Sequence, residues 1–348
     1  MRATAANIMK VCCVALAGSG LARAAGDTSS PGNIFAPAST PASSIYDLAI
    51  LILVITGVIF VVVAGMLVYA SVKFRSKPGD EHKEPLQIYG SDQLELAWTV
   101  IPVLIVIVMF MTSARIIHAV QDAGQPPGTI QVTVTGHQFW WEFRYPQYGF
   151  VTANELHVPV SDPAHPTPTY LQLLSADTDH SFWVPRLAGK TDLIPNHPNT
   201  TWIDPHETGL FLGQCAQYCG TQHAKMLLRV VVDSRADFDK WVHLQQAKVQ
   251  PDASLSPDAE EGRRVFNRTA CINCHTISGS VADGRFGPDL THLMGRETIG
   301  SGAAPNSAEN LKAWIQNPAT FKPGVLMPAM NLTDKELAAV TAYMQTLR

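Results

Sequence analysis

Two cysteine motifs carry the residue types most suited to chemistry in this chain of 348 residues. The first places two thiols, an imidazole and a thioether within twelve residues, at Cys215, Cys219, His223 and Met226. Soft sulfur ligands beside imidazole suit copper or zinc better than magnesium or calcium. Cysteines and histidines could also form a structural zinc tetrahedron. The spacing of the two cysteines and the nearby thioether favour copper, but zinc stays open on these residues alone.

The second motif, Cys271-Ile-Asn-Cys274-His275, is typical of covalent c-type haem attachment. Two thiols at this spacing can form thioethers with the haem vinyl groups, and His275 can then bind the iron. A redox dithiol or half of a zinc site is the alternative. A methionine usually supplies the second axial ligand. We expect Met327, because its Lys-Pro-Gly-Val-Leu-Met-Pro run resembles the ligand loop of class I cytochromes c, with Met330 as the rival.

The composition indicates a membrane protein. The formal net charge is −4, hydrophobic residues make up 46% and charged residues only 16%, against about 25% charged in soluble domains. This excludes a broadly basic nucleic-acid binder and a disordered chain. Two uncharged runs predict a transmembrane hairpin within residues 26–120, with helices at about 48–72 and 94–117.

Charge and targeting signals predict the orientation. Residues 1–25 have a basic start, a short apolar run and a small-residue end, which is typical of a cleaved secretory signal peptide; an uncleaved anchor is the alternative. Lysines and arginines gather in the loop 73–93, which the positive-inside rule places in the cytoplasm. We therefore expect everything after about residue 118 to lie outside the cell membrane.

The outer part divides into two domains. Alternating segments at 131–160 and 227–232 predict a small antiparallel β-sandwich or barrel within residues 121–248. Residues 249–255, which contain a proline, read as a linker. Ser256 then reads as a helix N-cap, and a Thr333–Glu336 capping box opens a last helix. Residues 256–348 are thus expected to form a mostly helical domain.

The motif at 215–226 resembles the dinuclear copper A site of cytochrome c oxidase subunit II. The likeness continues through 136–141, 179–185, 190–195 and 209–215 and includes both predicted membrane helices, so that it covers residues 45–245. The tail resembles the cytochrome c domain fused to this subunit in some bacterial oxidases. The resemblance implies a cupredoxin-like β-sandwich or barrel followed by an all-α cytochrome c domain, on the periplasmic side of a bacterial inner membrane.

The resemblance also implies a residue-by-residue site. The copper ligands would be the side chains of His180, Cys215, Cys219, His223 and Met226 and the backbone carbonyl of Gln217. Relatives commonly carry Glu in place of Gln217, where it helps to hold magnesium, so the magnesium site is doubtful here.

The same resemblance assigns roles to residues outside the copper motif. Electrons would enter through the aromatic run Phe139-Trp140-Trp141, in which Phe139 replaces the usual Trp. Glu95 lies where relatives have the mouth of a proton-uptake channel, although an acidic residue also favours any helix N-terminus.

The implied function is electron input to a haem-copper oxidase. Electrons would pass from a soluble or membrane cytochrome c, or from an upstream complex, through haem c and copper A to subunit I, which reduces dioxygen to water and pumps protons. Expected partners are subunit I, the other oxidase subunits and membrane lipid, with no nucleic acid. The alternatives are the electron-input subunit of a copper A-containing nitric oxide reductase and a quinol oxidase subunit II, which lacks copper.

Overall fold

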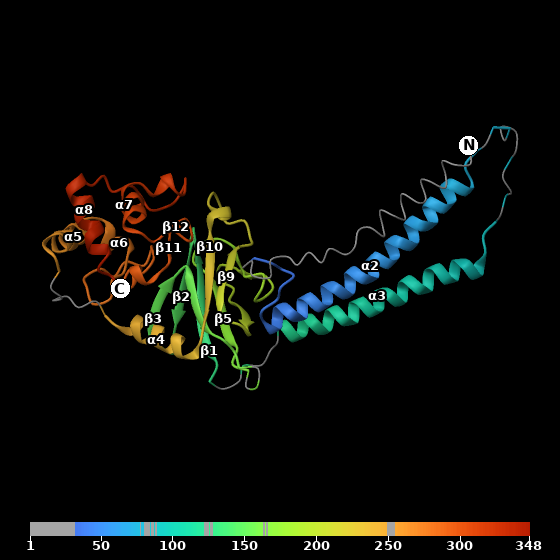
Figure 1. Cartoon of the computed structure of the whole chain (residues 1–348), viewed down its shortest axis with the longest axis horizontal. Helices are drawn as coiled ribbons and strands as arrows, with labels where there is room; N and C mark the ends of the chain where they lie inside the picture. Colours follow the sequence, from blue (N-terminus) through green and yellow to red (C-terminus); the bar gives the residue numbers. More distant parts are fainter. Residues whose placement is uncertain are drawn as a thin grey trace.

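The computed structural model describes residues 32–76, 78–79, 84, 87, 89–121, 125, 128–162, 164, 166–248 and 255–348. The predicted signal peptide and residues 249–254 of the predicted linker lie outside the described residues. Figure 1 shows two long helices on one side of a β domain (residues 128–248), and a C-terminal domain (residues 255–348) on its other side.

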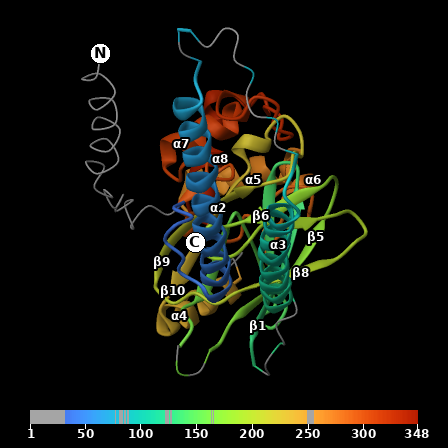
Figure 2. The same ribbon diagram turned by 90° about the vertical axis from the view of Figure 1, so that its right-hand side faces the viewer.

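The two long helices, α2 (Thr40–Lys73) and α3 (Asp92–Gln121), are long and apolar enough to cross a membrane. They lie side by side in both views (Figures 1 and 2) and leave their apolar side chains exposed. Both are longer than predicted, because polar first and last turns extend each helix beyond the uncharged run that the sequence marks.

The ends of the hairpin are fixed to the β domain. The indole Nε1 of Trp202 donates to the carbonyl of Val120 at 2.7 Å, and the amide of His206 donates to Ala38 O at 2.9 Å. Ser39 also bridges to Pro205 in antiparallel fashion. These bonds set the β domain directly against the end of the membrane hairpin.

The β domain is a sandwich of two five-stranded sheets, in the orders β3-β2-β1-β5-β8 and β4-β10-β9-β6-β7. Its strands are β1 (Ile130–His137), β2 (Trp140–Tyr145), β3 (Phe150–Ala153), β4 (Glu155–Pro159), β5 (Thr169–Ser175), β6 (His180–Trp183), β7 (Thr191–Leu193), β8 (Asn199–Ile203), β9 (Gly209–Cys215) and β10 (Leu227–Asp233). The two sheets bury a common core that includes Trp141, Phe143 and Phe182, and helix α4 (Arg235–Gln246) follows β10.

The predicted sandwich is confirmed, but it is not purely antiparallel. Strand β1 pairs with β5 in parallel, and β10 pairs with β4 in parallel. The cause is the path of the chain, which leaves the first sheet at β4 and returns to it at β5, so both crossing strands arrive beside neighbours that run the same way. Alternation within one strand cannot reveal this order.

The C-terminal domain is mostly helical, as predicted. Its elements are α5 (Pro257–Arg268), α6 (Cys271–Cys274), η2 (Leu293–Gly295), β11 (Thr298–Ile299), β12 (Ala304–Pro305), α7 (Ala308–Gln316), η3 (Pro318–Thr320) and α8 (Asp334–Met344). The N-cap at Ser256 and the capping box at Thr333 are both confirmed. Helices α5 and α8 cross closely, with Phe266 edge-on to Tyr343 at 5.9 Å. The short β11–β12 ladder was not expected from the sequence.

Candidate metal centre and haem pocket

Strand pairing brings the five predicted metal-binding side chains together. His180 begins β6, Cys215 ends the neighbouring strand β9, and Phe182 faces Cys215 in the register of that pair. The loop after β9 carries Cys219, the 3₁₀ turn η1 (His223–Lys225) carries His223, and Met226 caps that turn. We call these five residues the Cys–His cluster.

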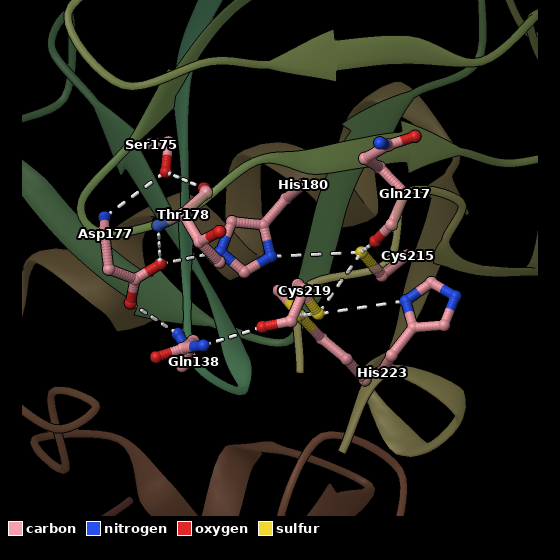
Figure 3. Close-up of polar contacts among 10 residues, drawn as sticks. Gln138, Ser175, Asp177, Thr178, His180, Cys215, Gln217, Cys219 and His223 are labelled. Carbon is pink, nitrogen blue, oxygen red and sulfur yellow. Dashed lines mark hydrogen bonds and ion pairs between the residues drawn. The ribbon is translucent and has the colours of Figure 1, made fainter. Parts of the chain in front are cut away.

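The distances within the Cys–His cluster are short and repetitive (Figure 3). The two Sγ atoms of Cys215 and Cys219 lie 3.8 Å apart. Cys215 Sγ lies 3.8 Å from His180 Nδ1, and Cys219 Sγ lies 3.8 Å from both His223 Nδ1 and Met226 Sδ. The cluster thus pairs each thiol with a different imidazole.

The backbone carbonyl of Gln217 also faces this cluster. The Cys215 thiol lies 3.1 Å from Gln217 O, whereas the residue as a whole is exposed. Its carbonyl can therefore serve the metal while its side chain remains at the surface.

Burial and polar contacts favour metal binding here. His180, Cys215, Cys219 and Met226 are all buried. The hydrogen bond between the two thiols lowers the pKa of Cys215 to about 3 and raises the pKa of Cys219. The pair therefore loses its first proton readily, and thiolates are the species that bind metals.

The donor set fits copper. Two thiols, two imidazoles and a thioether are the ligands that copper prefers, while a thioether suits zinc poorly. His180, Cys215 and Cys219 place their ligand atoms within 4.8 Å of one another. A Cβ on Gly136 would lie 2.8 Å from His180 Cδ2, so glycine is needed for the imidazole to take this position.

Two residues that sequence reasoning missed support the cluster. Asp177 Oδ1 lies 2.8 Å from His180 Nε2, an arrangement that fixes the ring and its tautomer. Gln138 donates its backbone N–H to Asp177 Oδ2 at 2.7 Å and its side-chain amide to Cys219 O at 2.6 Å. The position of Asp177, three residues before a candidate ligand, was the available signal for it; Gln138 was marked only by its place in the run 136–141.

The haem-attachment motif lines a largely apolar pocket in the C-terminal domain. Cys271, Cys274 and His275 lie on its wall with Met327 and Met330, so the pocket brings together all the predicted haem residues without choosing between the two methionines. Both cysteines are free thiols in the described structure. The pocket residues therefore fit a covalently attached haem.

The imidazole of His275 is held ready to bind iron. Its Nδ1 lies 2.7 Å from Pro288 O, which leaves Nε2 for the metal. Burial lowers the pKa of His275, so the ring is held in the neutral form that binds iron. A Cβ on Gly287 would lie 2.7 Å from His275 Cε1, which explains the small residue there.

The two sites meet at residues 138–140. Gln138, Phe139 and Trp140 of the β domain line the haem pocket of the C-terminal domain. Phe139 and Trp140 are only 7% and 9% exposed, and Trp140 stacks on His137 at 4.2 Å. Trp141 is fully buried, with its ring 6.1 Å from that of His180.

Glu95 lies elsewhere. It occupies the first turn of α3, at the end of the hairpin away from the β domain. Its role in proton uptake stays a prediction.

The chain matches three families of known domains. Residues 29–116 match the family "Cytochrome C oxidase subunit II, transmembrane domain", residues 163–234 match "Cytochrome C oxidase subunit II, periplasmic domain", and residues 259–348 match "Cytochrome c". These matches fall on the hairpin, the β domain and the C-terminal domain in turn.

Individual relatives agree with these matches. Cytochrome c oxidase subunit 2 of Alkalihalophilus pseudofirmus is 35% identical over 318 residues, with 90% of each chain covered. The subunit 2 of Bacillus sp. strain PS3 is also 35% identical, with 79% of this chain and 80% of the relative covered. A crystal structure of the periplasmic domain of subunit II of cytochrome oxidase from Bradyrhizobium japonicum is 29% identical, covers 35% of this chain and 97% of its own, and has a TM-score of 0.33.

Family identity bears on the alternatives. Copper and haem binding both follow from the matched domains, which disfavours the copper-free quinol oxidase subunit. The full-length relatives named here are oxidase subunits, which favours the oxidase over the nitric oxide reductase. The chain belongs to the cytochrome c oxidase subunit II family, as a membrane-bound component of that oxidoreductase with a cytochrome c domain at its C-terminus.

Proposed function

We propose that this subunit relays electrons from a covalently bound haem c to a dinuclear copper A centre and on to subunit I. The observation that carries the proposal is the position of Gln138, which lines the haem pocket and donates to the carbonyl of Cys219 at 2.6 Å. One residue thus contacts both the haem pocket and a copper ligand.

The residues of this chain have distinct roles in that relay. Cys215, Cys219, His180 and His223 would hold the two copper ions, and Gln217 O and Met226 would complete the ligand set. When bound, copper would supply reversible one-electron chemistry at this site. Asp177 keeps the His180 ring oriented, and the buried core around the cluster excludes water.

The haem side uses a second set of residues. Cys271 and Cys274 would hold the haem through thioethers, while His275 and Met327 would bind its iron. Phe139 and Trp140, which line the pocket, would form the contact through which electrons leave it.

The direction of flow sets the partners and the location. The β domain and the C-terminal domain would lie on the periplasmic side, where a c-type cytochrome or an upstream complex supplies electrons. Subunit I would receive them, reduce dioxygen and pump protons, with Glu95 near the mouth of a proton-uptake path on the opposite side.

Rapid photoreduction of haem c in the purified complex tests the relay. Oxidation of haem c, followed at the Soret band, should have the same time constant as reduction of copper, followed at the near-infrared band. The two must agree because one electron leaves haem c for each one that copper gains. Copper analysis should give two ions in addition to the copper of subunit I, and haem should stay bound to this subunit on a denaturing gel. Independent time constants for the two bands, or haem that dissociates on denaturation, would contradict the proposal.

A further inference from the structure

A buried carboxylate joins the C-terminal domain to the β domain. Glu155 begins β4, and its side chain is 3% exposed. Its Oε2 accepts the backbone N–H of Glu297 at 2.9 Å, and its Oε1 accepts the backbone N–H and the hydroxyl of Thr298, both at 2.9 Å. All three donors belong to the C-terminal domain, so docking of that domain satisfies the carboxylate.

These bonds are directional as well as strong. A carboxylate loses much solvation on burial unless donors replace the water, and charge-assisted hydrogen bonds have strict geometry. Arg229 of the β domain lies 3.7 Å from Glu155 Oε1 and also bonds to the carboxylate of Glu297. The group therefore favours one relative position of the two domains.

The same group fixes a wall of the haem pocket. Thr298 is the first residue of β11, and Ile299 and Gly300, which follow it, line the pocket. Glu155 thus holds the start of β11, whose residues form part of the pocket wall.

Two further contacts hold the same position. Lys322 is 1% exposed, and its Nζ donates to Phe139 O at 3.2 Å and to Gly300 O at 3.0 Å. The hydroxyl of Ser301 donates to Leu227 O at 2.5 Å. The bonds to Phe139 O and Leu227 O cross the interface, so a shift along it would break both, while the bond to Gly300 O fixes the lysine within its own domain.

We propose that Glu155 is a positioning residue that locks the C-terminal domain in one docked position, with the haem pocket facing Phe139 and Trp140, so that the domain does not swing on its linker during turnover. The docking contacts of Glu155 do not depend on whether haem c passes electrons to copper. Its value for electron transfer rests on the relay proposed above.

Hydrogen–deuterium exchange of the full-length subunit in its complex tests the lock directly. In Glu155→Gln one carboxylate oxygen becomes an NH₂ group that faces N–H donors, so the amides of Glu297 and Thr298 should exchange about tenfold faster or more, as expected for loss of one charge-assisted hydrogen bond. Glu142→Gln is the matched control, because Glu142 bonds to Arg144 within the β domain. Equal exchange in the two variants would overturn the lock.

Two further measurements guard against a misfolded variant. Thr298→Val removes one donor and should give a smaller increase in exchange. In the unmodified complex, transfer from haem c to copper should keep its rate from low to high salt, because a fixed contact needs no electrostatic encounter. A rate that changes severalfold with salt would overturn the single docked position. No electron transfer in the unmodified complex would instead contradict the proposed relay. The docked position would then still be tested by the hydrogen–deuterium exchange of the Glu155 variant.

Discussion

At the scale of single residues, Met226 is the best probe of the Cys–His cluster, because its replacement should disturb the fold little. Its Sδ lies 3.8 Å from Cys219 Sγ, and the side chain is buried. Met226→Leu conserves volume and should cost less than about 1.5 kcal/mol of stability. Loss of the thioether should nevertheless shift the copper near-infrared and paramagnetic resonance spectra of the complex.

A half-buried methionine outside the cluster gives the control for this change. Met294→Leu in the C-terminal domain should leave the copper spectra as they are. Identical spectra for the parent and Met226→Leu would remove Met226 from the ligand set.

Gln217 allows a test of the doubtful magnesium site. Its carbonyl faces Cys215 while the residue is exposed, so a new carboxylate could meet a hard cation at the border with subunit I. Gln217→Glu should raise the occupancy of manganese, measured by paramagnetic resonance of the complex, because carboxylate oxygen suits such cations. Gln246→Glu adds the same charge on α4 and should have no effect; a site unchanged by Gln217→Glu would have to be built from other residues.

The sequence marks the candidate copper and haem ligands that the fold brings together, but it does not mark Asp177 and Gln138, which contact the Cys–His cluster from elsewhere in the β domain. Cys215, Cys219, His223 and Met226 lie within twelve residues, so their spacing alone marks them. The bond from Gln138 to Cys219 O spans 81 positions. Such long-range contacts depend on strand pairing, which no local pattern encodes.

At the scale of elements, the crossing of α5 and α8 depends on Gly262. A Cβ at this position would lie 1.9 Å from Ala339 O, a backbone atom that cannot move without separating the helices. Gly262→Ala should therefore destabilise the C-terminal domain by about 1–3 kcal/mol. Thermal unfolding followed at the Soret band would show a lower Tm, while the copper bands should be lost at the parent temperature.

The matched change Gly295→Ala separates crowding from helix propensity. The nearest atom to its new Cβ would be Gln245 Nε2 at 3.9 Å, so the Tm should hardly change. Equal Tm values for the two variants would show that the crossing has room for a methyl group.

Element types followed from local patterns better than element order did. The capping box at Thr333 and the N-cap at Ser256 mark helix starts by local hydrogen bonding, and both were predictable. The parallel pairing of β4 with β10 joins strands about seventy residues apart along the chain. It reflects the packing of two sheets and could not be predicted from alternation.

At the scale of the whole molecule, the buried Lys322 between the two domains makes the stability of the folded chain depend on pH. Burial lowers the pKa of Lys322 to about 8 from 10.5, so the unfolded chain holds the proton more tightly between those values. Stability therefore rises with pH in this window, by at most about 3 kcal/mol. The Tm of the full chain, compared with that of Lys322→Met, should rise from pH 8 to pH 10.5; a constant difference would mean that the ammonium is not buried in solution.

The two domains have separate cores, so their contributions can be separated by truncation. One core fills the β domain, and another packs α5, α7 and α8 of the C-terminal domain. Deletion of residues 250–348 should accordingly leave the copper spectrum of the complex intact, while Phe139 and Trp140 become exposed. The spectrum is the control that the β domain still folds.

Loss of the tethered donor should still slow the complex. A linked domain acts at an effective concentration in roughly the millimolar range, and the docked haem pocket already faces Phe139 and Trp140. A free cytochrome c must find that surface by diffusion, and Phe139 offers it a smaller aromatic contact than the usual Trp. Oxidation of soluble cytochrome c should fall severalfold or more at low donor concentration. Turnover at the parent rate would make haem c a side branch, because electrons would then reach copper equally well without it.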